Sequence, residues 1–177
     1  MKLLFDLLRP GMDRSGFSCG DPALDAYLHK QAGQDMRRGF ATVIAARQSM
    51  SPEKVVGFYT LSAASILLNS LPNEMARKMP RYPSVPAIRL SRLAVDISKQ
   101  KQRVGSLLVM DALRRACQNE LAWAIFLVDA KSEKSAVFYE KFLFQHFQEN
   151  SLALWMVRKM QKKLYIIINI INKFCIS

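Results

Sequence analysis

Ile88–Cys117, IRLSRLAVDISKQKQRVGSLLVMDALRRAC, is the stretch that decides the fold of this chain. It opens with a short apolar run, Leu90–Val95, which is compatible with a β-strand, and continues into the polar, basic loop Asp96–Arg103. Beyond Gly105 the apolar residues recur at helical spacing. A strand, a tight loop and a helix in this order direct backbone N–H groups towards an anion at the helix N-terminus. The cationic side chains of the loop add to that positive potential, so the stretch predicts an anion-binding loop.

The same loop resembles the acetyl-CoA loop of GNAT-superfamily acetyltransferases, in which Q/R-x-x-G-x-G/A joins a central strand to a helix. The corresponding residues are Gln100–Gly105, whose first Gln and last Gly match, while Arg103 takes the place of the middle glycine. A second segment, FYEKFLF at Phe138–Phe144, is similar to the family's FYE-(R/K)-F-G-F, with Leu143 where glycine is usual. The loop, the spacing and this second segment together are fairly specific to the superfamily.

A narrower resemblance is to the GNAT toxins of type II toxin–antitoxin systems, of which TacT- and AtaT-like proteins are examples. It covers roughly residues 7–157 and rests on these segments: Ser15–Gly20, Leu24–Leu28, Gln31–Ala32, Val56–Leu61 and Arg92–Asp96. The resemblance implies a GNAT fold, with a mixed central sheet flanked by helices and a splayed pair of strands that holds the cofactor.

Hydrophobic periodicity and turn residues predict strands alternating with helices, which is typical of an α/β fold around a mixed sheet. We expect strands at 3–8, 40–46, 55–64, 90–95, 122–130, 144–149 and 152–157. We expect helices at 21–39, 71–79, after Gly105 and at 132–141, and an extended connection at 81–86. Residues 1–160 are expected to form the GNAT domain. The tail 161–177, rich in Ile, Asn and Lys, is interpreted as a read-through or frameshift extension, or else as an added amphipathic helix.

Length and composition predict one globular domain, since half of the 177 residues are hydrophobic and 23% are charged. The formal charge of +12 indicates either a partner rich in phosphates, such as RNA, or a surface that is merely basic. Composition does not separate the two, and the resemblance favours tRNA. No signal peptide and no run of about 18 apolar residues is found, and the three cysteines lack metal-ligand spacing, so we expect a cytoplasmic protein outside the membrane.

Acetyl transfer from a thioester to an amine requires a positioned cosubstrate, donors for the oxyanion and a proton for the departing thiolate. Backbone groups of Leu93, Ala94 and Val95 are expected to pair with the pantetheine arm. The resemblance implies that acetyl-CoA is the cosubstrate and that its pyrophosphate binds Gln100, Lys101, Gln102, Arg103, Val104, Gly105 and Ser106. It also implies that Tyr139 protonates the thiolate.

Other side chains have plainer interpretations. The ring of Tyr139 would, without the motif, be read as a core aromatic packed on Phe138 and Phe142. Cys19 is read as structural, Asp129 and Glu140 are weaker catalytic candidates, and no metal site is expected because the two histidines, His29 and His146, are isolated. The candidates for RNA contact are cationic: Lys30, Arg37, Arg38, Arg77, Lys78, Arg81, Arg89 and Arg92.

These observations lead to the hypothesis of an N-acetyltransferase, most consistent with a toxin that blocks translation by acetylating the α-amine of an aminoacyl-tRNA. The resemblance further implies a ribbon-helix-helix antitoxin and a homodimer. Two alternatives remain: a catalytically impaired protein that only binds antitoxin or RNA, favoured by Arg103 and Leu143, and an acetyltransferase for small amines or protein N-termini. Because arginine replaces glycine in the loop, we expect weakened acetyl-CoA binding that Arg103→Gly would restore.

Overall fold

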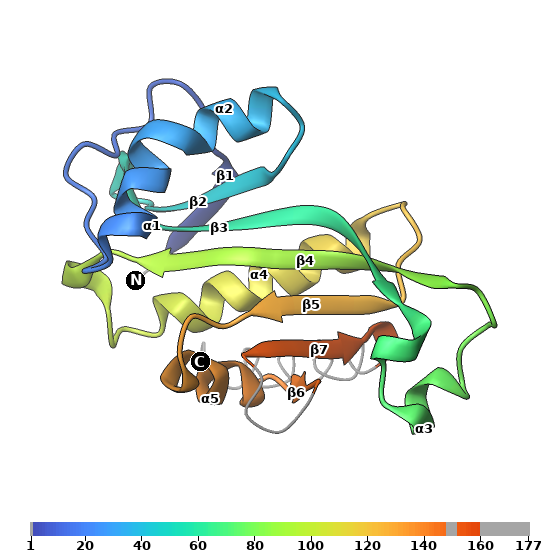
Figure 1. The fold of residues 1–177 in the computed structure, drawn as a ribbon. Coiled ribbons are helices and arrows are strands. Elements are labelled where there is room, and N and C mark those ends of the chain that lie inside the picture. Colours follow the sequence, from blue (N-terminus) through green and yellow to red (C-terminus); the bar gives the residue numbers. More distant parts are fainter. Residues whose placement is uncertain (1, 148–151, 160–177) are drawn as a thin grey trace. The chain divides into compact units, whose positions relative to one another are not determined.

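A computed structural model describes residues 2–147 and 152–159, and within them seven strands form one mixed sheet in the order β1-β2-β3-β4-β5-β7-β6 (Figure 1). The strands are β1 Leu3–Leu7, β2 Thr42–Gln48, β3 Ser51–Leu67, β4 Ser84–Val95, β5 Ile125–Asp129, β6 Gln145–His146 and β7 Ala153–Val157. The helices are α1 Pro22–Ala26, α2 Ala32–Arg37, α3 Asn73–Ala76, α4 Val104–Gln118 and α5 Glu133–Glu140. The expected tail 161–177 lies outside the described residues.

The chain divides into two compact units, which are described in turn. The first comprises Met1–Ser62 with Leu90–Ala112, and the second comprises Ala63–Arg89 with Leu113–Ser177. The elements β3, β4 and α4 contribute residues to both units.

The first helical segment of unit one begins where the sequence predicts. The Asp21 carboxylate accepts hydrogen bonds from the N–H groups of Ala23 and Leu24, and Pro22 occupies the first turn, where its missing N–H leaves no acceptor unpaired. A π-helical turn, Tyr27–Gln31, joins α1 to α2, a feature that the spacing of apolar residues does not reveal. Gly39, at φ +74°, ends the segment in the left-handed conformation that glycine adopts without strain.

The sheet of unit one is covered on both faces. Tyr27, Leu28 and Ala32 of the helical segment pack on Val43 and Phe58 in one buried cluster. On the opposite face the hydroxyl of Tyr59 in β3 donates a buried hydrogen bond of 2.7 Å to the Asp111 carboxylate of α4. Burial on both faces explains why β2 reads as a continuous apolar run rather than an alternating one.

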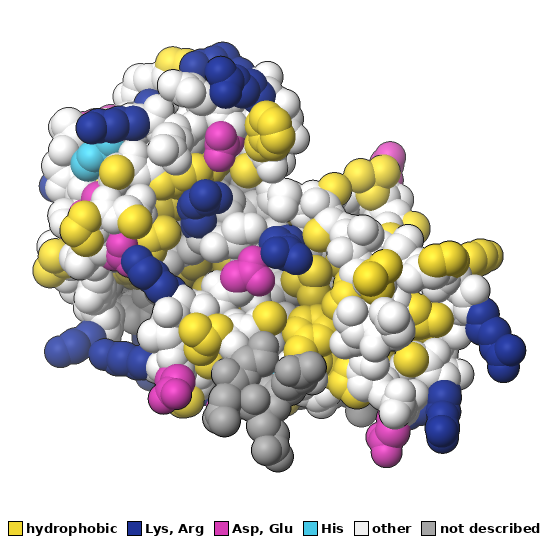
Figure 2. Space-filling model, in the orientation of Figure 1, with side chains coloured by type: hydrophobic (Ala, Val, Ile, Leu, Met, Phe, Trp, Pro, Cys, Tyr) yellow, Lys and Arg dark blue, Asp and Glu magenta, His cyan; other side chains and the backbone are white. Residues whose placement is uncertain are grey.

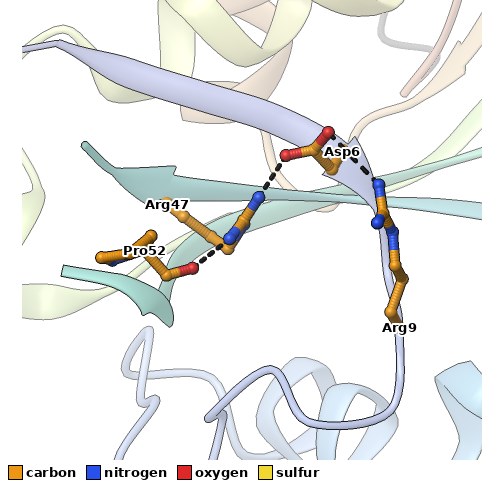
Figure 3. Close-up of polar contacts among 4 residues, drawn as sticks. All are labelled: Asp6, Arg9, Arg47 and Pro52. Carbon is orange, nitrogen blue, oxygen red and sulfur yellow. Dashed lines mark hydrogen bonds and ion pairs between the residues drawn. The ribbon is translucent and has the colours of Figure 1, made fainter.

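A polar cluster fixes the edge of this sheet (Figure 3). β1 pairs antiparallel with β2, and β2 with β3. Arg47 of β2 forms an ion pair with Asp6 of β1 and also donates to the carbonyl of Pro52 in β3. Arg9 lies 3.6 Å from Asp6 on the exposed side. One arginine therefore joins three strands at the edge.

In unit two, each face of the sheet also has its own cluster. Val85, Ala87, Ile125, Leu127 and Trp155 pack together with Leu71 on one side. An aromatic cluster contains the strand residue Phe126 and the rings of Phe144 and Tyr139, with centroids 5.8 and 5.9 Å apart in successive edge-to-face pairs. β5 and β6 both pair antiparallel with β7.

Element lengths are where the prediction was least accurate. β3 extends to Leu67 and β4 begins at Ser84, so part of the expected connection 81–86 belongs to a strand. The predicted helix 71–79 is reduced to Asn73–Ala76. Strand pairing depends on a partner that is distant in sequence, so the local pattern indicates an element more reliably than its ends.

Candidate functional site

The loop between β4 and α4 is fixed by the carboxylate of Asp96. Its Oδ1 accepts hydrogen bonds from the N–H and hydroxyl of Ser98, at 3.0 and 2.6 Å, and so begins a 3₁₀ turn, Ile97–Lys99. Its Oδ2 accepts from the N–H of Ser18 at 3.1 Å. Burial opposes the charge of Asp96, but these hydrogen bonds outweigh it and lower the pKa. The loop is thereby held against the segment that precedes α1.

Two glutamine side chains brace the loop from within. The amide of Gln100, the first residue of the motif, donates to the carbonyl oxygens of Cys19 at 2.9 Å and Val95 at 3.1 Å. The amide of Gln102 donates to the carbonyl oxygen of Ser98 at 2.9 Å. In this structure both side chains therefore shape the loop, and the N–H groups from Ile97 to Gln100 also have acceptors within the protein.

The loop ends at the N-terminus of α4, where an anion fits. The Arg103 carbonyl accepts the N–H of Leu107, so the N–H groups of Val104, Gly105 and Ser106 have no acceptor within the helix. Lys101 and Arg103 are exposed, and neither has an ion-pair partner within residues 2–147 and 152–159. Free N–H groups with two cations nearby suit the pyrophosphate of a nucleotide cosubstrate.

Gly57 of β3 is a positioning residue that the sequence did not single out. A Cβ at this position would lie 3.2 Å from the carbonyl oxygen of Ala94 and 3.1 Å from Cδ1 of Leu108. The glycine thus allows β3 to lie close to the end of β4 and to α4. A glycine inside a strand pattern is the signal that could have indicated this close approach.

Tyr139 belongs to unit two. Its ring packs in the core, as expected for a structural aromatic residue, and its hydroxyl is able to donate a proton, as expected for the catalytic residue. It lies on α5, which begins at the N-cap Ser132, and its ring packs edge-to-face on Phe138 at 5.2 Å. The side chain is buried, yet its hydroxyl has no hydrogen-bond partner in the described part of the chain. Burial first, and then the charge of Asp129, raise the pKa of Tyr139, so the hydroxyl stays protonated and able to donate.

An open groove of about 690 Å³ lies in the same unit. Arg89 of β4 and Asp129 at the end of β5 both line it, and their side chains form an ion pair of 3.1 Å. Apolar side chains, including Leu127 and Phe147, form other parts of the lining. Asp129, a weaker catalytic candidate from the sequence, is therefore an ion-paired carboxylate at the groove.

The remaining titratable candidates have structural partners. Burial, together with a hydrogen bond to Asp25, raises the pKa of Cys19 to about 11, so its thiol is not an ionised nucleophile at neutral pH. Glu140 contacts Nε2 of His146 at 2.7 Å. No group of His, Cys, Asp and Glu side chains within the described ranges could hold a metal ion.

The cations expected to contact RNA belong to both units. Figure 2 shows Lys and Arg side chains spread over the face in view. In unit one, Lys30, Arg37 and Arg38 are exposed, while Arg92 stacks over the Tyr27 ring with its Cζ 3.9 Å from the centroid. In unit two, the exposed cations lie on and after α3: Arg77, Lys78 and Arg81. Arg89 and Arg92 each have an internal partner, so the other six are freer to bind phosphate.

None of the helices in the described part of the chain is both long and apolar enough to cross a membrane.

Comparison with known proteins gives consistent results, although no family model matches the chain. The chain is 35% identical over 150 residues to a tRNA-acetylating toxin of Mycobacterium tuberculosis, which covers 83% of this chain and 87% of that protein. A tyrosine-to-phenylalanine mutant of KacT has 27% identity and a TM-score of 0.84, over 93% of this chain and 99% of that one.

Two structures of AtaT are also similar. AtaT complexed with acetyl-methionyl-tRNAfMet is 28% identical with a TM-score of 0.83, covering 93% of this chain and 99% of that one. A mutant AtaT bound to acetyl-CoA and to the C-terminus of the antitoxin AtaR is 25% identical with a TM-score of 0.76, covering 92% and 98%.

Proposed function

The chain belongs to the GNAT acetyltransferase toxins, and on that premise we propose that it acetylates the α-amine of an aminoacyl-tRNA and thereby blocks translation. The observation that carries this proposal is the 35% identity, over 83% of the chain, to a tRNA-acetylating toxin. The free N–H groups and cations at the start of α4 support acetyl-CoA as the cosubstrate.

Each part of the proposed site has a chemical task. The N-terminus of α4, Lys101 and Arg103 bind the pyrophosphate, and the backbone of Leu93–Val95 pairs with the pantetheine arm. Acetyl-CoA supplies the thioester carbon. The tRNA's α-amine, whose reference pKa is about 8, has a substantial unprotonated fraction near neutral pH and attacks that carbon. The C–S bond breaks, and the hydroxyl of Tyr139 donates a proton to the departing thiolate. The proton that the nitrogen loses as it becomes an amide passes to solvent, and solvent returns a proton to Tyr139.

The partners and location follow from the same premise. We assign the chain a ribbon-helix-helix antitoxin, a homodimeric state and a cytoplasmic location, where charged tRNA is found. The exposed cations of both units supply contacts for tRNA phosphates. Arg103 and Leu143 do not prevent the expected backbone, because both adopt positive φ, at 64° and 66°. This favours an active enzyme over the impaired alternative.

The test is an acetyl-transfer assay with radiolabelled acetyl-CoA. The full-length protein is incubated with charged tRNA, with deacylated tRNA and with free amino acids, alongside Tyr139→Phe. Label should appear only in charged tRNA and should be released as an N-acetylamino acid when the ester is hydrolysed. Label in free amines but not in charged tRNA would support the small-amine alternative. Binding of acetyl-CoA without any transfer would support the impaired alternative.

A further inference from the structure

A second groove, of about 540 Å³, lies beside α3 in unit two and exposes an aromatic ring. Tyr82, which is 68% exposed, lines it together with Leu67, Arg81 and Pro83. Leu67, which lines the same groove, is 58% exposed, so two large apolar side chains are exposed together rather than singly. Apolar side chains exposed as a group, and not one by one, are the pattern typical of a binding surface.

The backbone around Tyr82 is held in place. The N–H of Tyr82 donates to the carbonyl of Pro80 at 2.8 Å, and the carbonyl of Pro83 accepts from Leu68 at 3.1 Å. The two prolines limit the backbone further, because proline fixes its own φ and restricts the residue before it. The ring is therefore presented by an ordered segment, and less conformational entropy is lost when a ligand binds.

The charges around this groove favour a polyanion. Arg77, Lys78 and Arg81 are all exposed, and none has an ion-pair partner among the residues that the structure describes. Glu74 is the one acidic residue between Asn73 and Pro83. Cations beside an exposed aromatic ring are the usual combination for unpaired nucleic acid: the cations bind phosphates, and any base stacks on the ring.

The two grooves of unit two adjoin. Asn69 lines both the groove that contains Tyr82 and the larger one that contains Arg89 and Asp129. Asp129 acts electrostatically on Tyr139, the proposed proton donor. If the aminoacylated 3′ end of a tRNA occupies the larger groove, the RNA chain passes Asn69. A nucleotide that precedes the terminal one then lies at Tyr82.

We propose that Tyr82 and the cations beside it form a stacking platform for one of the three unpaired nucleotides of the 3′-terminal CCA of the substrate tRNA. This inference rests on the proposed function and assigns part of its substrate-binding surface. Tyr82 binds the tRNA and takes no part in proton transfer.

The test measures binding of two tRNA transcripts, one ending in CCA and one lacking those three nucleotides, at a fixed salt concentration. Stacking on a base contributes about 1–3 kcal/mol, so Tyr82→Ala should weaken binding of the intact transcript by about 5- to 150-fold. Tyr82→Trp should bind nearly as the parent does, because it keeps a stacking face. Leu121→Ala is the matched control, since Leu121 is 70% exposed in the same unit but does not line the groove.

The shortened transcript should bind the parent and Tyr82→Ala equally. In the transfer assay, Tyr82→Ala should raise KM for charged tRNA and leave both kcat and KM for acetyl-CoA unchanged. Unchanged binding of the intact transcript, or equal loss for both transcripts, would overturn the platform. Loss of antitoxin binding without loss of tRNA binding would identify the groove as a protein-binding surface instead.

The two proposals can fail separately. If the parent transfers acetyl to charged tRNA but Tyr82→Ala behaves identically, only the platform fails. If Tyr82→Ala distinguishes the two transcripts but the parent transfers no acetyl, the platform stands and the proposed reaction fails.

Discussion

At the scale of single residues, the backbone conformation of Arg103 and Leu143 decides whether replacing the motif glycines lowers folding stability or acetyl-CoA affinity. Arg103 has φ +64° and Leu143 has φ +66°, and both stand where the resembling motifs have glycine. A non-glycine residue in this region is strained by roughly 1–2 kcal/mol. The strain is present without any ligand, so it lowers folding stability rather than acetyl-CoA affinity. The sequence predicted weak acetyl-CoA binding mainly because of this strain at Arg103. Since the strain does not depend on the ligand, that reason no longer holds.

Arg103→Gly should therefore stabilise the fold, by about 0.5–1 kcal/mol once the greater unfolded-state entropy of glycine is included, or about 1–4 °C in Tm. It should weaken acetyl-CoA binding by up to about fivefold, because an exposed cation contributes about 1 kcal/mol or less. Calorimetry measures both. Leu143→Gly is the control and should raise Tm with unchanged affinity. Binding tightened tenfold would mean that the Arg103 side chain obstructs the cosubstrate.

Tyr139→Phe should retain acetyl-CoA affinity and lose turnover by roughly 100-fold or more, since only the donor hydroxyl is removed. Burial raises the pKa of Tyr139, so the parent's rate should rise as the substrate amine deprotonates near pH 8 and should not fall again as pH approaches about 10. Steady-state kinetics across this range checks both statements. If the variant and the parent turn over equally, Tyr139 takes no part in the reaction.

At the scale of elements, Asp96 connects two segments that are far apart in the chain. Its carboxylate binds Ser98 in the loop before α4 and Ser18 before α1. The N–H of Ile97 also donates to the Ser18 carbonyl at 2.8 Å. The shape of the proposed pyrophosphate loop thus depends on a segment about eighty residues earlier in sequence.

Asp96→Asn should destabilise the protein at pH 7 by about 1–3 kcal/mol, because hydrogen bonds to a buried charge are lost. The folded-state pKa of Asp96 is lowered below its unfolded value near 3.9, so this stability is fully present above about pH 4. It is lost as pH falls through the folded-state pKa. Urea unfolding should therefore show a difference between parent and variant that shrinks below about pH 4.

Asp13→Asn is the matched control for this experiment. Asp13 also accepts hydrogen bonds from the N–H and hydroxyl of a nearby serine, Ser15, but its carboxylate is exposed and, within the described residues, hydrogen-bonds to no segment distant in sequence. It should change stability little. If the two substitutions lower the free energy of unfolding equally at pH 7, the hydrogen bond from Ser18 to Asp96 does not contribute to stability.

At the scale of the whole molecule, the net charge of +12 is spread over exposed cations in both units. If these cations contact phosphates, raising salt from about 50 to 200 mM should weaken tRNA binding by orders of magnitude for six or more contacts. The double variant Arg37→Glu with Arg38→Glu should weaken it further and reduce the salt dependence, as filter binding would show. Binding that is insensitive to salt would favour the small-amine alternative.

The domain boundary proposed near residue 160 is also a property of the whole chain. Truncation after Met160 should leave Tm and acetyl-CoA affinity unchanged if residues 161–177 are an accidental extension. Differential scanning calorimetry provides the measurement. A large fall in Tm would show that the isoleucines of the tail belong to the core.

The sequence by itself determined the features that depend on neighbouring residues. These include the strand, loop and helix of Leu90–Cys117, the start of the first helix at Asp21, and the family, since each is encoded over a few consecutive positions. Only the tertiary structure decided the lengths of β3 and β4, the contact of Asp96 with Ser18, the Arg89–Asp129 pair and the grooves of unit two. These depend on which distant segments meet, and no local propensity specifies that meeting.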